Sequence, residues 1–148
     1  MKHKSRMPYL QRQTRLLHSA ALLFGLAFFL TSCFLKQDRT TTVYGTITDQ
    51  NEQPVDSILV LASGLEFLKY EDLRQVYSSK EGKYELVIDV PKKFNSVDIV
   101  IPFGIDINPK YQNNYKGNHV RKNDAATNNC CIASIGEKTK YDFQLIPK

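Results

Sequence analysis

Histidine is scarce in this chain, and so are the residue patterns that mark an enzyme or a metal site. Of the three histidines only His119 follows Cys33, and no partner pattern surrounds it. A nucleophile-elbow motif is missing, and Asp106 and Asp124 stand too far apart in sequence to suggest a calcium loop. We therefore expect no catalytic residue, no metal and no cofactor. A solvated loop position is a better interpretation of His119 than a catalytic base.

Acidic residues are absent from the first 15 positions, whereas five basic residues occur there: Lys2, Lys4, Arg6, Arg12 and Arg15. These five account for the whole excess of 20 basic over 15 acidic residues. If they are removed with a signal peptide, the remaining chain is neutral and has no net field to attract a polyanion. The sequence pI of about 9.1 therefore does not indicate a nucleic-acid partner.

A hydrophobic run long enough to span a bilayer is also missing. The apolar run from Leu16 to Leu30 is short of the roughly 20 residues that a transmembrane helix needs, but it suits the core of a helical signal peptide. It ends in Leu30-Thr31-Ser32-Cys33, which resembles the lipobox of bacterial lipoproteins: an aliphatic residue, two small residues, then the cysteine whose thiol accepts a diacylglyceryl group. An uncleaved anchor helix is the alternative.

The resemblance to bacterial lipoproteins implies a cellular location and a lipid anchor. It predicts a signal peptide over 1–32, cleavage before Cys33, lipidation of that cysteine with palmitate-type chains, and a short tether over 33–41. An aspartate after the lipidated cysteine is the common inner-membrane retention signal in this class, and Phe34 stands there instead. We therefore expect a lipid-anchored protein of the cell envelope, in the outer membrane rather than the inner one.

Residues 42–148 are predicted to form a single domain with an all-β fold. Residues 41–49 alternate strictly, with Val43, Gly45 and Ile47 on one face. Residues 65–73 are ambiguous, because leucines at helical spacing are compatible with a helical turn or with an excursion between strands. Further strands are expected at 58–62, 74–78, 83–89, 97–101, 132–135 and 141–146. About seven short strands and no long helix predict an antiparallel sandwich.

Two segments combine turn residues and strands in a characteristic order. The first is Gly45-Thr46-Ile47-Thr48-Asp49 followed by Pro54-Val55 and Ile58-Leu59-Val60, and the second runs from Ser78 through Gly82 and Tyr84 to Leu86. Together they resemble carboxypeptidase-regulatory-like domains. The resemblance implies a seven-stranded, transthyretin-like (Ig-like) sandwich that serves as an accessory module rather than a catalyst. Glu52 and Ser57 stand near positions where the family often has glycine. The histidines and the C-terminal motif of transthyretin-like purine-pathway hydrolases are missing.

The turn residues of these segments have physical roles of their own. Gly45 allows a neighbouring chain to lie against the first strand. Asp49 can accept hydrogen bonds from turn amides, and Gly82 can take positive φ in the turn that begins at Ser79.

Cys130 and Cys131 are adjacent and are the only thiols left if Cys33 is lipidated. Two unpaired, buried thiols at the start of a strand are the preferred interpretation. A vicinal disulfide, intermolecular pairing, and metal binding with His119 are the alternatives. Alternation along a strand would point the two side chains to opposite faces, which argues against joint metal ligation.

Residues 104–130 read as a long polar loop rich in asparagine and tyrosine. A flexible or partly folded crossing between sheets is the preferred interpretation. The alternative is a ligand-binding loop, because tyrosine and amide side chains suit a sugar or a peptide, with Tyr111, Tyr115 and Asn114 as the candidates.

These observations support a membrane-anchored, non-enzymatic accessory or interaction module of the envelope. Its partners would be the membrane, through the lipid anchor, and an envelope protein or a glycan. The alternative function is a surface glycan- or peptide-binding protein that uses the 104–130 loop.

Overall fold

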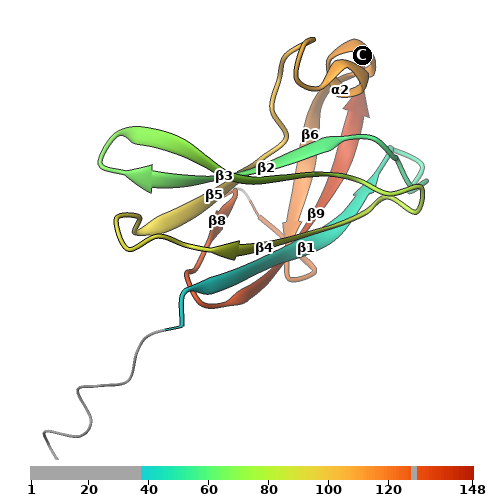
Figure 1. Ribbon diagram of the computed structural model, residues 1–148. Coiled ribbons are helices and arrows are strands. Elements are labelled where there is room, and N and C mark those ends of the chain that lie inside the picture. Colours follow the sequence, from blue (N-terminus) through green and yellow to red (C-terminus); the bar gives the residue numbers. More distant parts are fainter. Residues whose placement is uncertain (1–37, 128–129) are drawn as a thin grey trace, which may run out of the picture. The chain divides into compact units, whose positions relative to one another are not determined.

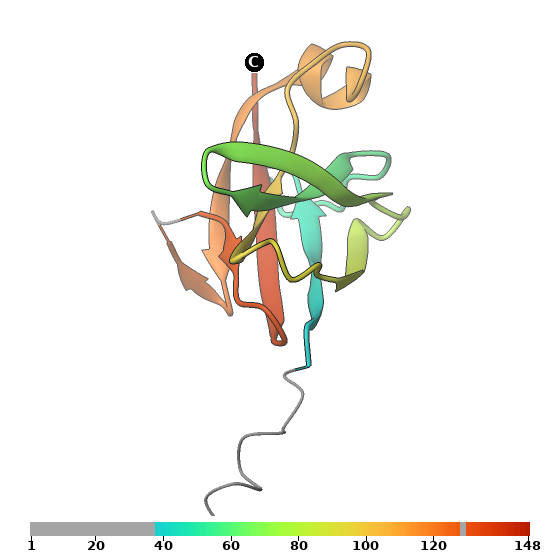
Figure 2. The same ribbon diagram turned by 60° about the vertical axis from the view of Figure 1, so that its left-hand side comes forward.

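The computed structural model describes residues 38–127 and 130–148, which form two β-sheets (Figures 1 and 2). The five-stranded sheet has the order β4 (Lys83–Asp89), β1 (Thr40–Thr48), β9 (Lys138–Pro147), β6 (Tyr115–Lys122) and β7 (Ala125–Ala126). The four-stranded sheet has the order β3 (Lys69–Tyr77), β2 (Leu59–Glu66), β5 (Ser96–Val100) and β8 (Ile132–Ala133). The predicted all-β sandwich is confirmed at this level.

Two details of the predicted sandwich are wrong. The described residues contain nine strands rather than about seven, and the sheets are not purely antiparallel, because β1 runs parallel to β9. A parallel pair needs a crossover connection. Here the first and last strands of the described domain pair with each other, so the whole intervening chain forms that connection.

The core lies between the sheets and follows from alternation along the strands. In β4 every second residue is buried, from Tyr84 through Leu86 to Ile88, and β1 and β9 show the same period of two. The opposite sheet contributes Val60 and Ala62 from β2 and Val97 and Ile99 from β5. Phe94 closes one end of the core, with its ring packed where a side chain at Gly64 would otherwise lie.

The turns expected from the sequence form as predicted. Gly82 has a φ of 68°, and the Ser79 hydroxyl accepts hydrogen bonds from the amides of Glu81 and Lys83. The Asp49 carboxylate accepts from the amides of Asn51 and Gln53, at 2.8 and 2.9 Å. Both turns therefore satisfy backbone donors with a side-chain oxygen.

Glu52 and Ser57 occupy left-handed backbone conformations, with φ of 62° and 58°. Glycine adopts this region without steric cost, whereas other residues do so rarely. The turn from β1 to β2 therefore keeps a glycine-type backbone at two positions that are not occupied by glycine.

The ambiguous segment 65–73 is a hairpin and not a helical turn. Strands β2 and β3 pair in antiparallel register from Leu59↔Tyr77 to Glu66↔Lys69, which leaves Phe67 and Leu68 as the turn. The leucine spacing does not mark the buried face of a helix, because Leu68 lies in the turn at the hairpin tip and is 94% exposed.

Residues 104–130 cross from the four-stranded to the five-stranded sheet, as expected, but they contain more regular structure than the long polar loop suggested by the sequence. The segment contains the short helix α2 (Pro109–Asn114) and strands β6 and β7. Proline suits the first turn of a helix because its missing N–H would have no partner there, and β6 joins the sheet by pairing with β9. Within the described residues, no helix has the length and apolar character needed to cross a membrane.

Candidate functional site

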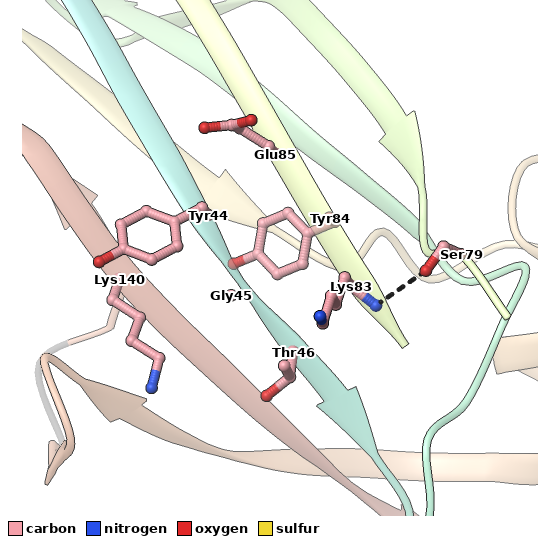
Figure 3. A pocket seen from close by; sticks show the side chains of 8 residues that line it. All are labelled: Tyr44, Gly45, Thr46, Ser79, Lys83, Tyr84, Glu85 and Lys140. Carbon is pink, nitrogen blue, oxygen red and sulfur yellow. Dashed lines mark hydrogen bonds between the residues drawn. The ribbon is translucent and has the colours of Figure 1, made fainter. Parts of the chain in front are cut away.

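A hollow of about 470 Å³ lies on the five-stranded sheet, where β4, β1 and β9 run side by side (Figure 3). Its rim carries Tyr44 and Thr46 from β1, Lys83 and Glu85 from β4, and Lys140 from β9. These side chains alternate with the core residues of the same strands, so they lie on the outer face of the sheet.

The hollow forms where the ladder between β1 and β9 is interrupted. The pairs Tyr44↔Lys140 and Ile47↔Phe143 are in register, but the residues between them are not paired. The chains approach so closely here that a side chain at Gly45 would clash with the Tyr141 carbonyl oxygen. The expectation that Gly45 lets a neighbouring chain lie against the first strand is confirmed.

Side chains replace the missing backbone hydrogen bonds at this interruption. The Tyr84 hydroxyl lies over Gly45 (Figure 3). It donates to the Tyr141 carbonyl oxygen at 2.7 Å. Asp142 Oδ1 accepts from the Thr46 amide at 2.9 Å and from its hydroxyl at 2.8 Å. Backbone groups that would otherwise lack partners are thus satisfied.

The charges around the hollow are held in fixed protonation states. Hydrogen bonds to Asp124 and Asp142 raise the pKa of Lys140, and the hydrogen bond with Lys140 lowers the pKa of Asp124. Burial, together with the nearby charge of Asp142, raises the pKa of Tyr84. Lys140 is therefore a permanent cation at neutral pH, and Tyr84 is a neutral hydrogen-bond donor.

Tyr44 offers the hollow an aromatic surface. The Lys138 ammonium lies 4.6 Å from the centre of the Tyr44 ring and 3.9 Å from the Glu85 carboxylate. The ring itself is half-buried. A flat, half-exposed ring bordered by both charge signs is suited to stacking and hydrogen bonding with a polar ligand. Protonated Lys140 and the neutral Tyr84 phenol are poorly suited to nucleophilic attack or proton abstraction.

The three residues predicted to bind a ligand on the 104–130 loop have different environments. Tyr111 is only 2% exposed, packs against Phe103 and Tyr115, and accepts a hydrogen bond from Asn118 at 3.0 Å. Its ring belongs to the core and is not available as a binding surface.

Tyr115 and Asn114 lie together at the edge of a second hollow of about 400 Å³, with Lys110 and Asp49 also lining it. Asn114 donates to the Lys110 carbonyl oxygen at 2.8 Å and is otherwise exposed. The predicted trio is therefore reduced to two residues that share a surface.

His119 is exposed on the outer face of β6, where it pairs with Gln144 of β9. It borders a hollow of about 280 Å³ together with Thr46, Arg121 and Asp142. Neither a serine nor a cysteine lines that hollow. Within the part of the chain that the structure describes, no three His, Cys, Asp or Glu side chains gather as they would around a metal ion.

Cys130 and Cys131 lie just before β8. Their sulfur atoms are in bonding contact, and the peptide bond between them is cis. Cys131 is buried, whereas Cys130 is exposed. This differs from the expectation of two buried thiols, while the pairing of the two cysteines in the native protein stays a prediction.

Cys33, the proposed lipidation site, lies outside the described residues, as do the predicted signal peptide and most of the tether. Comparison of the chain with protein-family models, with curated proteins and with solved structures found no match. The resemblance to carboxypeptidase-regulatory-like domains therefore remains a prediction.

Sequence reasoning missed the β2–β3 hairpin tip, made of Phe67 and Leu68. These two side chains are 91% and 94% exposed. One signal was available: oppositely charged Glu66 and Lys69 flank the apolar pair and face each other across the hairpin. It was hard to recognise because neither turn residue is glycine, asparagine or aspartate.

Proposed function

We propose that this protein is a lipid-anchored component of the bacterial cell envelope whose β-sandwich acts as a non-enzymatic accessory or interaction module. The observation that carries the proposal is Leu30-Thr31-Ser32-Cys33, at the end of a basic segment and a short apolar run. The structure supports it in one respect: β1, the first strand of the described residues, begins at Thr40, only seven positions after Cys33, so the tether to the folded domain would be short.

We further propose that the sandwich is of the carboxypeptidase-regulatory-like, transthyretin-like type. Gly45 makes the close approach that such a glycine implies, and Gly82 adopts positive φ in the turn before Tyr84. The left-handed backbones at Glu52 and Ser57 also support the resemblance, because the family often has glycine at these places. In that family the domain is usually an accessory that lies beside peptidases, within outer-membrane receptors or alone on surface lipoproteins, and Phe34 favours the outer membrane.

The anchor is tested with Cys33→Ala in the full-length chain. We expect wild-type protein in the membrane fraction with a labelled fatty acid on Cys33, and an unlabelled variant that is not processed. The double variant Cys130→Ser with Cys131→Ser is the matched control and should keep both label and localisation. An unlabelled wild-type chain in the soluble fraction would refute the anchor.

A second candidate function, glycan or peptide binding, is favoured by the hollow around Tyr44. Its aromatic ring and mixed charges suit such ligands better than the buried Tyr111 does. Binding on a glycan or peptide array should disappear in Tyr44→Ala and persist in Tyr115→Ala. Loss of binding in Tyr115→Ala but not in Tyr44→Ala would place the ligand in the second hollow. An array without any binding would count against both hollows as ligand sites.

A further inference from the structure

The hairpin tip presents apolar surface to solvent at a strained position. Phe67 and Leu68 are the most exposed of the large hydrophobic residues described, and Tyr70, one residue beyond Lys69, is 62% exposed. Phe67 also has a φ of 55°, a conformation that bulky side chains rarely adopt. Backbone strain and exposed apolar surface occur together at this turn. This combination indicates that the two residues have a role other than stabilising the fold.

The tip lies at the same end of the sandwich as the start of β1. Thr40 pairs with Asp89 at the end of β4, and Leu65 near the tip pairs with Ser96 at the start of β5. The loop 90–95 joins these two places, and in Figure 1 the hairpin and the start of β1 both lie on the left, with the hairpin above the strand.

Polar contacts connect this end into one unit. Arg39 donates to the carbonyl oxygens of Val90, Pro91 and Phe94. Lys93, on the same loop, forms an ion pair with Glu71 of the hairpin. The first described residues and the hairpin are thus both held to the loop 90–95. We call these residues, 38–39, 90–95 and the hairpin tip, the N-terminal end.

The length of chain before this end limits its distance from a membrane. Asp38 is the fifth residue after Cys33, and an extended chain covers at most about 3.6 Å per residue step, or about 18 Å in all. A lipid on Cys33 would therefore keep the N-terminal end close to the bilayer, where even weak second contacts form at high effective concentration.

We propose that Phe67 and Leu68 insert into the bilayer that holds the lipid on Cys33, so that the domain is attached at two points and has a fixed orientation. This inference rests on the proposed lipid anchor. Tyr70 would lie at the headgroup level, where amphipathic rings are favoured.

A lipid surface fits the tip better than a protein partner does. Specific protein interfaces bury about 1,000 Å² or more, whereas the apolar surface here is confined to the tip and Tyr70. The next residues of β3, Glu71 and Asp72, are charged and exposed. Glu66 and Lys69 bring both charge signs to the tip, so insertion would not require anionic lipid and would be insensitive to salt.

The chain has no tryptophan, which provides a direct test. Leu68→Trp places a single indole at the tip. Ile105→Trp, at a residue that is 59% exposed in the loop before α2, is the matched control. Both full-length chains are produced in a lipoprotein-processing bacterium, and the lipid on Cys33 is verified by mass. The proteins are then reconstituted in phosphatidylcholine vesicles with and without brominated acyl chains.

We expect bromolipid to quench the Leu68→Trp indole about twofold or more, because inserted side chains reach the acyl boundary, and to leave the Ile105→Trp indole unchanged. Absence of quenching in a lipidated protein would overturn the membrane contact and leave the anchor intact. A chain without lipid on Cys33 would overturn the anchor. The Leu68→Trp fluorescence of that chain, measured with added bromolipid vesicles, would then test the membrane contact of the tip separately.

A second measurement does not depend on the probe. Amide exchange over residues 66–70 should slow on vesicles for the wild-type chain and for Ile105→Ser with Ile107→Ser, but not for Phe67→Asn with Leu68→Ser. Protection that appears only when other envelope proteins are added would identify a protein as the occupant and overturn the lipid contact.

Discussion

The two ends of the sandwich both expose apolar side chains, but they hold them differently. At the C-terminal end, formed by the loop 101–108 and α2, the half-exposed Phe103 packs its edge against Tyr111, which belongs to the core. At the N-terminal end, the hairpin carries Phe67 and Leu68 away from the core, where they are almost fully exposed. The first arrangement packs an exposed ring onto the core, whereas the second leaves two adjacent apolar side chains almost fully exposed.

The largest effect is expected at the C-terminal end, from Asn108→Ala. Asn108 is fully buried; its Oδ1 accepts from the Leu59 amide at 3.2 Å, and its Nδ2 donates to the Leu59 carbonyl oxygen at 3.2 Å. Loss of these bonds leaves backbone groups of β2 unsatisfied, so the free energy of unfolding should fall by about 2–3 kcal/mol. Urea denaturation measures it.

Asn114→Ala is the matched control for this change. The Asn114 side-chain amide donates a hydrogen bond to the Lys110 carbonyl oxygen at the exposed surface. The free energy of unfolding should therefore fall by no more than about 0.5 kcal/mol. Equal effects of the two variants would mean that Asn108 does not fix the loop before α2.

At the N-terminal end, Arg39→Ala should have the next largest effect. The guanidinium donates three hydrogen bonds to the loop 90–95 at 2.7 to 3.0 Å. Because Arg39 is half-buried, we expect a loss of about 1–2 kcal/mol in the free energy of unfolding. Lys92→Ala, an exposed change on the same loop, should leave the urea midpoint unaltered; a similar shift there would show that the loop is not held through Arg39.

Phe67→Asn separates stability from membrane contact. Asparagine tolerates the left-handed backbone better than phenylalanine does, so the free energy of unfolding should rise by about 0.5–1 kcal/mol, while vesicle protection of the hairpin is lost. Thermal unfolding and amide exchange measure the two effects. Leu68→Ser should reduce protection without the gain in stability. Destabilisation by Phe67→Asn would contradict the strain assigned to the tip.

The smallest effect concerns Asp98 on β5, whose pKa is raised mainly because partial burial disfavours its charged form. An acid with a raised folded-state pKa weakens folding above that pKa, and the penalty disappears as the pH falls toward the unfolded-state value near 4. Asp98→Asn should therefore stabilise the protein at neutral pH by less than about 1 kcal/mol. The gain should shrink as the pH is lowered to 4, and a gain that grew on acidification would contradict this sign.

The strands with strict alternation were predictable from the sequence. Tyr84, Leu86 and Ile88 face the core as expected, and Gly45 and Gly82 stand where a close approach and a left-handed turn require glycine. These features depend on local pattern alone, which a single sequence shows.

The hairpin and strand β6 were not predictable in this way. The turn at Phe67 lacks the residues that normally mark a hairpin, and Val120 is the only aliphatic residue of β6. The alignment of β6 is fixed by its pairing with β9, a tertiary interaction that local composition does not report. The hollow at Tyr44 also depends on non-local pairing, because it forms where β1 and β9 are interrupted.

Mass spectrometry of the N-terminal peptide, from the protein isolated from bacterial envelopes, decides whether the chain is lipid-anchored. We expect a chain that begins at Cys33 and carries a diacylglyceryl group on its sulfur. A chain that retains residues 1–32 with an unmodified Cys33 would contradict it.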